Sequence, residues 1–405
     1  MRLPGGGRLV TSAAILTRAP PRSSFAAVPT RRSDVRPPLW VWAVFLPLAA
    51  WWARYLSQHP GLNWDVVMYV ACVLEPDHAG APAALQAATL DVLRAQLPAA
   101  EYAEFTTGDY GARVASDAAF FDAELAKYRV KPLYVAAARA AYRLGAPAVA
   151  ATVWPSALGA VGLAALLLVW VGRHRSAGVA LAAALLLMVS HPLWYVGRFS
   201  TPDMLSAPLL MLACYLVYRR APAWAVAVAG VVAVGVRLDN VLACGALVLV
   251  AAYAQALGQG RSRGWSLRLV GGLAAAGLAL AVGGSVALGH DPLSLLGAYA
   301  HVYTAEGYAF HWTYSYTQFA HRSSGALIAG VAALAYAALD GESRRIVRIA
   351  AAVVALRLMA FPLFEERFFV GFEWAVLAAV GAGLGPKTAA AGPHGGDPAG
   401  SSALG

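Results

Sequence analysis

The chain carries little charge for its length. Only 13% of its 405 residues are Asp, Glu, Lys or Arg, whereas 60% are hydrophobic, and the mean hydropathy is +0.59. A water-soluble domain of this size does not need so much apolar surface, and several stretches approach the ~20 apolar residues that cross a bilayer. The composition therefore argues against a soluble protein and predicts a polytopic, all-helical membrane protein.

Residues that mark metal, disulfide and nucleotide sites are scarce. No glycine-rich loop of the phosphate-cradling kind occurs. The few cysteines are scattered in or near apolar segments, so we expect free thiols, and the histidines of one loop are too widely spaced for a metal motif. These residues are Cys72, Cys214, Cys244, His301, His311 and His321. The sequence therefore predicts no cofactor, and it leaves open a divalent metal held by a single protein carboxylate.

The formal net charge of +10 does not point to nucleic acid, because the basic residues gather at one side of the predicted membrane. Seven arginines lie before residue 37. Basic pairs and triplets also follow the apolar segments, and all fall on the side of the N-terminus, as the positive-inside rule requires. They are Arg173/Arg175, Arg219/Arg220, Arg261/Arg263/Arg268 and Arg344/Arg345/Arg348.

This charge pattern predicts a bundle of about ten spans with both termini in the cytoplasm. We expect a membrane domain over 38–385, flanked by disordered cytoplasmic tails at 1–37 and 386–405, in the bacterial cytoplasmic membrane. The expected spans are 38–56, 147–171, 177–197, 203–218, 222–237, 240–257, 268–289, 324–340, 346–362 and 369–385.

A long loop after the first span, residues 58–146, holds ten of the 21 acidic residues. Pro82 and Pro98 bound a helical pattern with Leu90, Leu93 and Leu97 on one face. A second helix is expected over 132–145, lying in the membrane interface with its basic side outward. The loop therefore predicts a small helical cap on the extracytoplasmic side.

Charged residues recur at the extracytoplasmic ends of the spans, where ionisable groups usually line a cavity or pair with each other. Asp65 follows the first span in Asn63-Trp64-Asp65, and Tyr128-Arg-Val-Lys-Pro-Leu-Tyr134 precedes the interfacial helix. Further along the chain come Arg198, Thr201-Pro-Asp203, Arg237-Leu-Asp239-Asn240 and Glu365-Glu366-Arg367-Phe368.

In the order and sidedness of these motifs, residues 38–385 resemble the GT-C superfamily of integral membrane glycosyltransferases, which includes protein O-mannosyltransferases and lipid A aminoarabinose transferases. One departure is that Asp65 is followed by Val66, where many relatives have a second acid. The resemblance implies transfer of a sugar from a polyprenyl-phosphate donor to an acceptor hydroxyl of a glycan, lipid or protein, outside the cytoplasmic face.

That chemistry needs a base for the acceptor hydroxyl and cations for the leaving phosphate. Asp65 is the expected base of an inverting transfer, and arginine suits phosphate because its planar fork binds two oxygens. We expect the donor phosphate on Arg237, Arg367, Lys131 and Arg198, with supporting acids Asp203, Asp239 and Glu366.

Each candidate also has a structural alternative, and the sequence leaves both open. Asp65 could be a first-turn carboxylate of a helix capped by Asn63. The remaining residues could pair locally or reach the interface: Arg198 with Asp203, Arg237 with Asp239, Arg367 with Glu366, and Lys131 alone. The aromatic loop 290–323 is expected to be an interfacial belt, with a substrate-gripping lid as the alternative.

Two other functions compete with glycosyl transfer. A transporter or flippase for lipid-linked sugars is the main alternative, although the inverted repeats common in transporters are not evident here. A non-catalytic membrane scaffold would not need so many charges on one side. The sequence does not identify the sugar or the acceptor.

Overall fold

The computed structural model describes residues 37–243, 304–322, 324–360 and 365–384, together with isolated positions between 245 and 286. These residues form helices joined by short turns and no β-strand; a single backbone bridge joins Gly61 to Phe199. The all-helical fold predicted from the sequence is therefore confirmed for the described part of the chain. The predicted tails lie outside it, except for Pro37.

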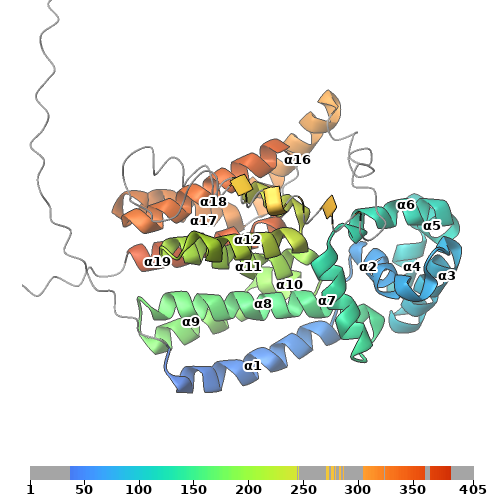
Figure 1. Cartoon of the computed structure of the whole chain (residues 1–405), viewed down its shortest axis with the longest axis horizontal. Coiled ribbons are helices and arrows are strands. Elements are labelled where there is room, and N and C mark those ends of the chain that lie inside the picture. Colours follow the sequence, from blue (N-terminus) through green and yellow to red (C-terminus); the bar gives the residue numbers. More distant parts are fainter. Residues whose placement is uncertain are drawn as a thin grey trace, which may run out of the picture. The chain divides into compact units, whose positions relative to one another are not determined.

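One group of helices forms a bundle whose members lie alongside each other (Figure 1). It packs around a large apolar core in which Phe45, Leu163, Trp170 and Met211 are fully buried. The bundle helices are α1 (Leu39–Gln58), α8 (Ala148–Gly172), α9 (Ala177–Val189), α10 (His191–Val196), α11 (Pro202–Tyr218), α12 (Ala223–Val236), α16 (Ala305–Arg322), α17 (Ser324–Ala335), α18 (Gly341–Ala360) and α19 (Val370–Gly383), with short 3₁₀ turns η2 (Leu238–Asn240), η4 (Tyr336–Ala338) and η5 (Glu366–Phe368).

The long loop after α1 folds into a helical cap at one end of the bundle, with α7 between the cap and the bundle (Figure 1). The cap has its own apolar core, in which Tyr69, Phe121 and Tyr134 are buried. Its helices are α2 (Asp65–Leu74), η1 (Glu75–His78), α3 (Pro82–Gln96), α4 (Ala99–Thr106), α5 (Gly108–Ser116), α6 (Ala118–Arg129) and α7 (Pro132–Arg143).

Local sequence signals start several of these helices. Pro82, Pro132 and Pro202 stand in the first turns of α3, α7 and α11, where the missing N–H costs nothing. The side chain of Asp117 accepts hydrogen bonds from the backbone N–H groups of Ala119 and Phe120 at the start of α6. The prediction of a helix between Pro82 and Pro98 is confirmed by α3.

Glycine permits very close contact between α11 and its neighbours. A Cβ on Gly159 of α8 would lie 2.1 Å from the carbonyl oxygen of Met204, and one on Gly371 of α19 would lie 2.6 Å from that of Ala207. Both contacts are with backbone, so a side chain cannot be accommodated by a rotamer change. Small residues at such crossings let helices in a membrane bundle approach closely, and here they fix the first turns of α11 against α8 and α19.

The count of about ten spans stays a prediction. By length and composition, α1 and α8 are the two described helices that could cross a bilayer, while α9, α11, α12, α17 and α19 are apolar but shorter. The expected spans 240–257 and 268–289 lie mostly outside the described residues. At the end of the bundle away from the cap, Arg220 pairs with Glu342, and Arg175 donates to the carbonyl of Gly381.

Two sequence expectations were wrong. The segment 177–197 is not one helix: α9 ends at Val189, Ser190 is extended, and α10 begins at His191. Pro192 has no N–H to donate to a helix continuing from α9, but it is tolerated in the first turn of α10. The aromatic segment expected as a loop over 290–323 contains α16 from Ala305 to Arg322. Residues 290–303 lie outside the described part of the chain.

Candidate active site

Asp65 begins α2, and three side chains hold its carboxylate. Oδ1 accepts a hydrogen bond from the Tyr128 hydroxyl at 3.0 Å, and Oδ2 accepts one from the Asn63 amide and one from the Arg367 guanidinium, both at 2.9 Å. Burial raises the pKa of Asp65, but the charges of Arg367 and Lys131 and the hydrogen bonds outweigh burial and hold the pKa below its usual 3.8. Asp65 is therefore ionised at neutral pH.

Arg367, in the short turn before α19, connects Asp65 to the bundle. Its Nε lies 2.5 Å from a carboxylate oxygen of the neighbouring Glu365 and 3.6 Å from Oδ2 of Asp203. The Arg367 side chain is only 22% exposed. One guanidinium thus joins the start of the cap, the start of α11 and the start of α19, although Asp65 and Arg367 are 302 positions apart in the sequence.

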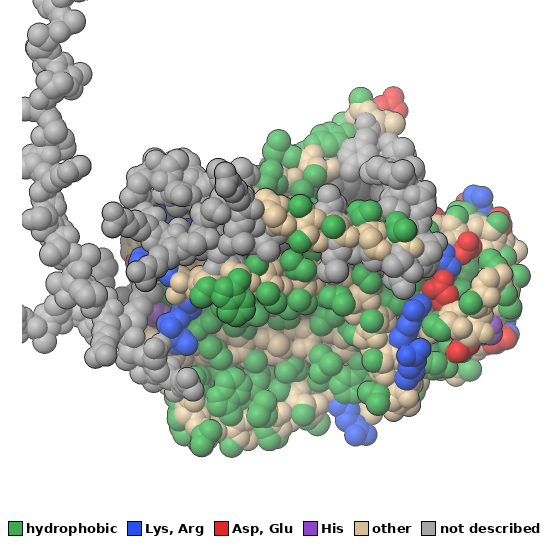
Figure 2. All heavy atoms as spheres, viewed as in Figure 1, with side chains coloured by type: hydrophobic (Ala, Val, Ile, Leu, Met, Phe, Trp, Pro, Cys, Tyr) green, Lys and Arg blue, Asp and Glu red, His purple; other side chains and the backbone are tan. Residues whose placement is uncertain are grey.

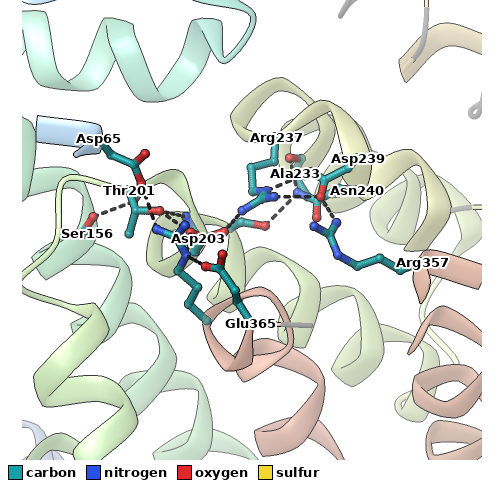
Figure 3. A network of polar contacts seen from close by, with 12 residues as sticks. Asp65, Ser156, Thr201, Asp203, Ala233, Arg237, Asp239, Asn240, Arg357 and Glu365 are labelled. Carbon is teal, nitrogen blue, oxygen red and sulfur yellow. Dashed lines mark hydrogen bonds and ion pairs between the residues drawn. The ribbon is translucent and has the colours of Figure 1, made fainter. Parts of the chain in front are cut away.

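Asp203 is the most deeply buried acid of the site, with its side chain 1% exposed. Thr201, which begins α11, directs its hydroxyl to Oδ2, and the other carboxylate oxygen contacts Arg237. The backbone of Thr201 is itself fixed, because the Ser156 hydroxyl of α8 donates to its carbonyl at 2.7 Å. Figure 3 shows Asp203 lying between Asp65, which begins α2, and Arg237, which follows α12.

Arg237 follows α12 and holds Asp239 through two parallel hydrogen bonds, each of 2.8 Å. This fork-to-carboxylate arrangement fixes both partners in orientation. The turn is anchored by Asn240, whose amide donates to the Ser206 hydroxyl at 2.7 Å and to the Ala233 carbonyl at 2.6 Å. The local pair of Arg237 with Asp239 is thus present, but Arg237 also contacts Asp203.

Arg357 of α18 lies at the end of the site opposite Asp65. Its guanidinium contacts Asp239, and its side chain is 9% exposed. The guanidinium carbons of Arg237, Arg357 and Arg367 lie 4.6, 4.4 and 5.2 Å from the centre of the Phe368 ring. These distances are within the range of cation–π attraction, so the one aromatic ring faces three cations.

Positive and negative side chains therefore alternate along one continuous row (Figure 3). We call it the charge row: Asp65, Arg367, Asp203, Arg237, Asp239 and Arg357. The cavity beside its inner part has a volume of about 10 Å³, roughly the space of one water molecule. A phosphate group could enter only if some of these side chains moved apart.

The other residues expected at the site are placed differently. Lys131 lies beside the row, with Nζ 5.4 and 4.8 Å from the ring centres of Tyr69 and Tyr128. Burial lowers its pKa to about 8, although Asp65 opposes this. Arg198 makes no ion pair within the described residues; it donates to the His59 carbonyl and covers the Trp194 ring.

Two of the structural alternatives are answered by these contacts. Asp203 pairs with Arg237 and Arg367, and no described ion pair joins it to Arg198. Arg367 is neutralised by Glu365 together with Asp65 and Asp203. The side chain of Glu366, predicted as a supporting acid, lies outside those that the structure describes.

Comparison of the chain with protein-family models, with curated proteins and with solved structures finds no match. The function therefore has to be inferred from the residues and their geometry. Within the part of the chain that the structure describes, no three His, Cys, Asp or Glu side chains are grouped so as to hold a metal ion. The acids of the charge row have arginines as partners instead, and the expectation of a site without cofactor stays a prediction.

Sequence reasoning missed Arg357 and did not assign roles to Tyr128 and Phe368. A usable signal existed for Arg357, because it is the one charged residue in the apolar run from 349 to 364. An arginine in such a run usually faces the bundle interior and finds a partner there. No comparable signal identifies Phe368, which becomes informative only when three guanidinium groups surround it.

Proposed function

We propose that the chain is an integral membrane glycosyltransferase that moves a sugar from a polyprenyl-phosphate donor to an acceptor hydroxyl on the extracytoplasmic side, with inversion at the anomeric carbon. The observation that carries the proposal is the ion pair of 2.9 Å between Asp65 and Arg367. It joins an ionised carboxylate at the cap to a row of buried arginines in the bundle. A base and a phosphate-binding site are the two parts that such a transfer requires.

In the proposed reaction, the acceptor hydroxyl gives its proton to Asp65 while its oxygen bonds to the anomeric carbon. The bond from that carbon to the phosphate oxygen breaks, and the phosphate leaves with the electron pair. Arg367 and Arg237 stabilise the charge that develops on the leaving phosphate, and Lys131 adds a third cation beside Asp65. Buried cations serve this role better than exposed ones because water screens them less.

The ion pairs of the free site also suggest the order of events. Arg367 is shared by Asp65, Asp203 and Glu365. A donor phosphate that takes one of these positions competes with Asp65 for the guanidinium. The carboxylate then loses a hydrogen bond that lowers its pKa, and it becomes a stronger base when the donor is present.

Transport or flipping of a lipid-linked sugar, the main alternative from the sequence, gains no specific support from the described residues. A transporter needs a substrate path open in turn to each face. The described residues instead present a carboxylate joined to buried arginines at the cap end of the bundle, which is the arrangement that transfer requires. We therefore argue transfer alone.

The test is a transfer assay with the full chain reconstituted in membranes and a panel of radiolabelled polyprenyl-phosphate sugars. With an accepted donor, Asp65→Asn should slow transfer by about 10²–10⁴-fold, the usual effect of losing a positioned base. Asp91→Asn is the matched control, because Asp91 is an exposed cap residue paired with Arg94. Donor binding and thermal unfolding, measured separately, should show that the Asp65 variant is folded and still binds.

Two results would contradict the proposal. One is an absence of transfer from every donor in the panel. The other is an Asp65→Asn variant that turns over like wild type. For the phosphate site, Arg367→Lys and Arg237→Lys should both weaken donor binding, because lysine keeps the charge and loses the two-point geometry.

A further inference from the structure

A second hollow lies on the cap, away from the charge row. It is a groove of about 1300 Å³ between α7 and the segment from Glu75 to Leu85. Asp65 begins α2 and Glu75 follows its last residue, so the groove and the proposed base lie at opposite ends of a helix about 15 Å long. Along α7, the groove is lined by one helical face: Pro132, Ala136, Arg139, Ala140 and Arg143.

Most of the charge in this groove is neutralised within it. Glu75 bridges Arg129, at 2.6 Å, and Arg139, at 3.1 Å. Arg129 also pairs with Asp122 at 2.9 Å. Arg143 lies one turn beyond Arg139 on the same face, is exposed, and makes no ion pair within the described residues. Three arginines and two acids leave the groove with one uncompensated positive charge at its Arg143 end.

The same end of the groove is apolar. Leu144, next to Arg143, lines this end and is 89% exposed, whereas Leu133 lines the groove at the other end of α7 and is 39% exposed. Ala148, four residues after Leu144, begins α8, one of the two helices long and apolar enough to cross a bilayer. Lys and Arg side chains gather over α7, between the apolar surface of the bundle and the acidic cap (Figure 2). An exposed leucine beside a basic residue at a helix end is typical of segments that lie in the membrane interface.

We propose that this groove binds an anionic phospholipid of the outer leaflet. Arg143 binds the headgroup phosphate, and Leu144 contacts the start of the acyl chains. The net charge of the groove favours this lipid, because a zwitterionic headgroup carries an ammonium that would oppose Arg143, while an anionic headgroup is neutralised by it. The inference rests on the membrane embedding in the proposed function and is independent of the transfer chemistry.

The test uses the full chain in detergent, titrated with short-chain phosphatidylglycerol while thermal unfolding is followed. Anything that binds only the folded state raises the unfolding midpoint with concentration. Phosphatidylglycerol should raise the midpoint of wild type, and Arg143→Gln should need roughly tenfold more lipid for the same rise, since one charge-assisted contact is lost. The control is Arg94→Gln, which removes an exposed arginine of the cap outside the groove.

Two further arms separate the possible ligands. Phosphatidylcholine of the same chain length should bind more weakly than phosphatidylglycerol, and inorganic phosphate should not raise the midpoint. Leu144→Ser should weaken lipid binding without changing Arg143, which keeps the test informative if the arginine variant is unstable. An equal response of wild type and Arg143→Gln, an equal effect of the two lipids, or full stabilisation by inorganic phosphate would overturn the proposal.

Discussion

Replacement of Gly159 by alanine should damage the site through packing alone. The new Cβ would lie 2.1 Å from the carbonyl oxygen of Met204 and 2.7 Å from Cα of Leu205, whereas ordinary contacts begin at 3.4 Å. The difference, 3.4 − 2.1, requires α8 and α11 to separate by about 1.3 Å, because backbone atoms cannot rotate away. Forcing extra volume into packed helices costs about 1–3 kcal/mol, against a gain of about 1 kcal/mol from the helix propensity of alanine.

The separation would reach the charge row. Ser156, one turn before Gly159, holds the carbonyl of Thr201, and Thr201 orients Asp203. A shift of α11 by more than 1 Å therefore moves Asp203 relative to its arginines, and displacements of this size far from the chemistry can lower a rate by about 10²-fold. We expect a net loss of stability of up to about 2 kcal/mol together with weaker transfer.

Gly162 offers a matched control on the same helix pair. A Cβ there would lie 3.4 Å from Cβ and 3.5 Å from Cγ of Pro208, which is ordinary contact. Gly162→Ala should therefore be neutral or stabilised by up to about 1 kcal/mol. The measurement is thermal unfolding of both variants in the same detergent, followed by transfer. If Gly159→Ala melts at or above the wild-type temperature, the close contact of α8 with α11 is not what fixes Asp203.

Three further predictions concern the charges themselves. Asp203→Asn should lower the free energy of unfolding by about 3–5 kcal/mol, because it leaves one buried positive charge between Arg237 and Arg367 without a matching carboxylate; an unchanged melting temperature would refute the shared role of Asp203. The pKa of Lys131 is about 8 in the folded chain, whereas its ordinary value is 10.5. Donor binding should therefore weaken as the pH rises through about 8, because Lys131 loses its positive charge. The free energy of unfolding should increase between pH 8 and pH 10.5, because the folded chain no longer buries that charge. Lys131→Arg stays charged, so its donor binding should not change across that window, and a fall like that of wild type would assign the titration to another group. Tyr128→Phe removes a hydrogen bond that lowers the pKa of Asp65, so the acid limb of the transfer profile should move to higher pH, and an unmoved limb would exclude this contact.

Parts of the fold that depend on local signals were predictable. Prolines and leucine spacing marked α3, and the apolar run at 147–171 matches α8 closely. The aromatic composition of residues 290–323 suggested a loop, but the spacing of its aromatic residues is helical. Tyr308, Trp312, Tyr316 and Phe319 recur at helical intervals within α16. Propensity and periodicity in the sequence are therefore sufficient to predict α3, α8 and α16.

The partners within the site could not be predicted in the same way. Sequence proximity suggested Glu366 for Arg367 and offered nothing for Asp65 beyond Asn63, because pairing across 302 positions has no local signal. Asp239 lies two residues from Arg237, and nothing in the sequence indicates that it also contacts Arg357. Ionisable groups buried in a bundle need partners of opposite charge, so each unpaired residue of this kind is itself a reason to look for a longer network.

In the proposed transfer, the charge balance of that network indicates which carboxylate a donor phosphate would displace. Among the side chains that the structure describes, four acids of the site are matched by four cations: Asp65, Asp203, Asp239 and Glu365, with Lys131, Arg237, Arg357 and Arg367. A phosphate that enters a neutral site must displace a carboxylate from an arginine. Arg367 is the easiest to share, since three carboxylates surround it, and its contact with Asp65 is less buried than its contact with Asp203. The displaced group is then Asp65, the residue that takes the acceptor proton in the transfer we propose.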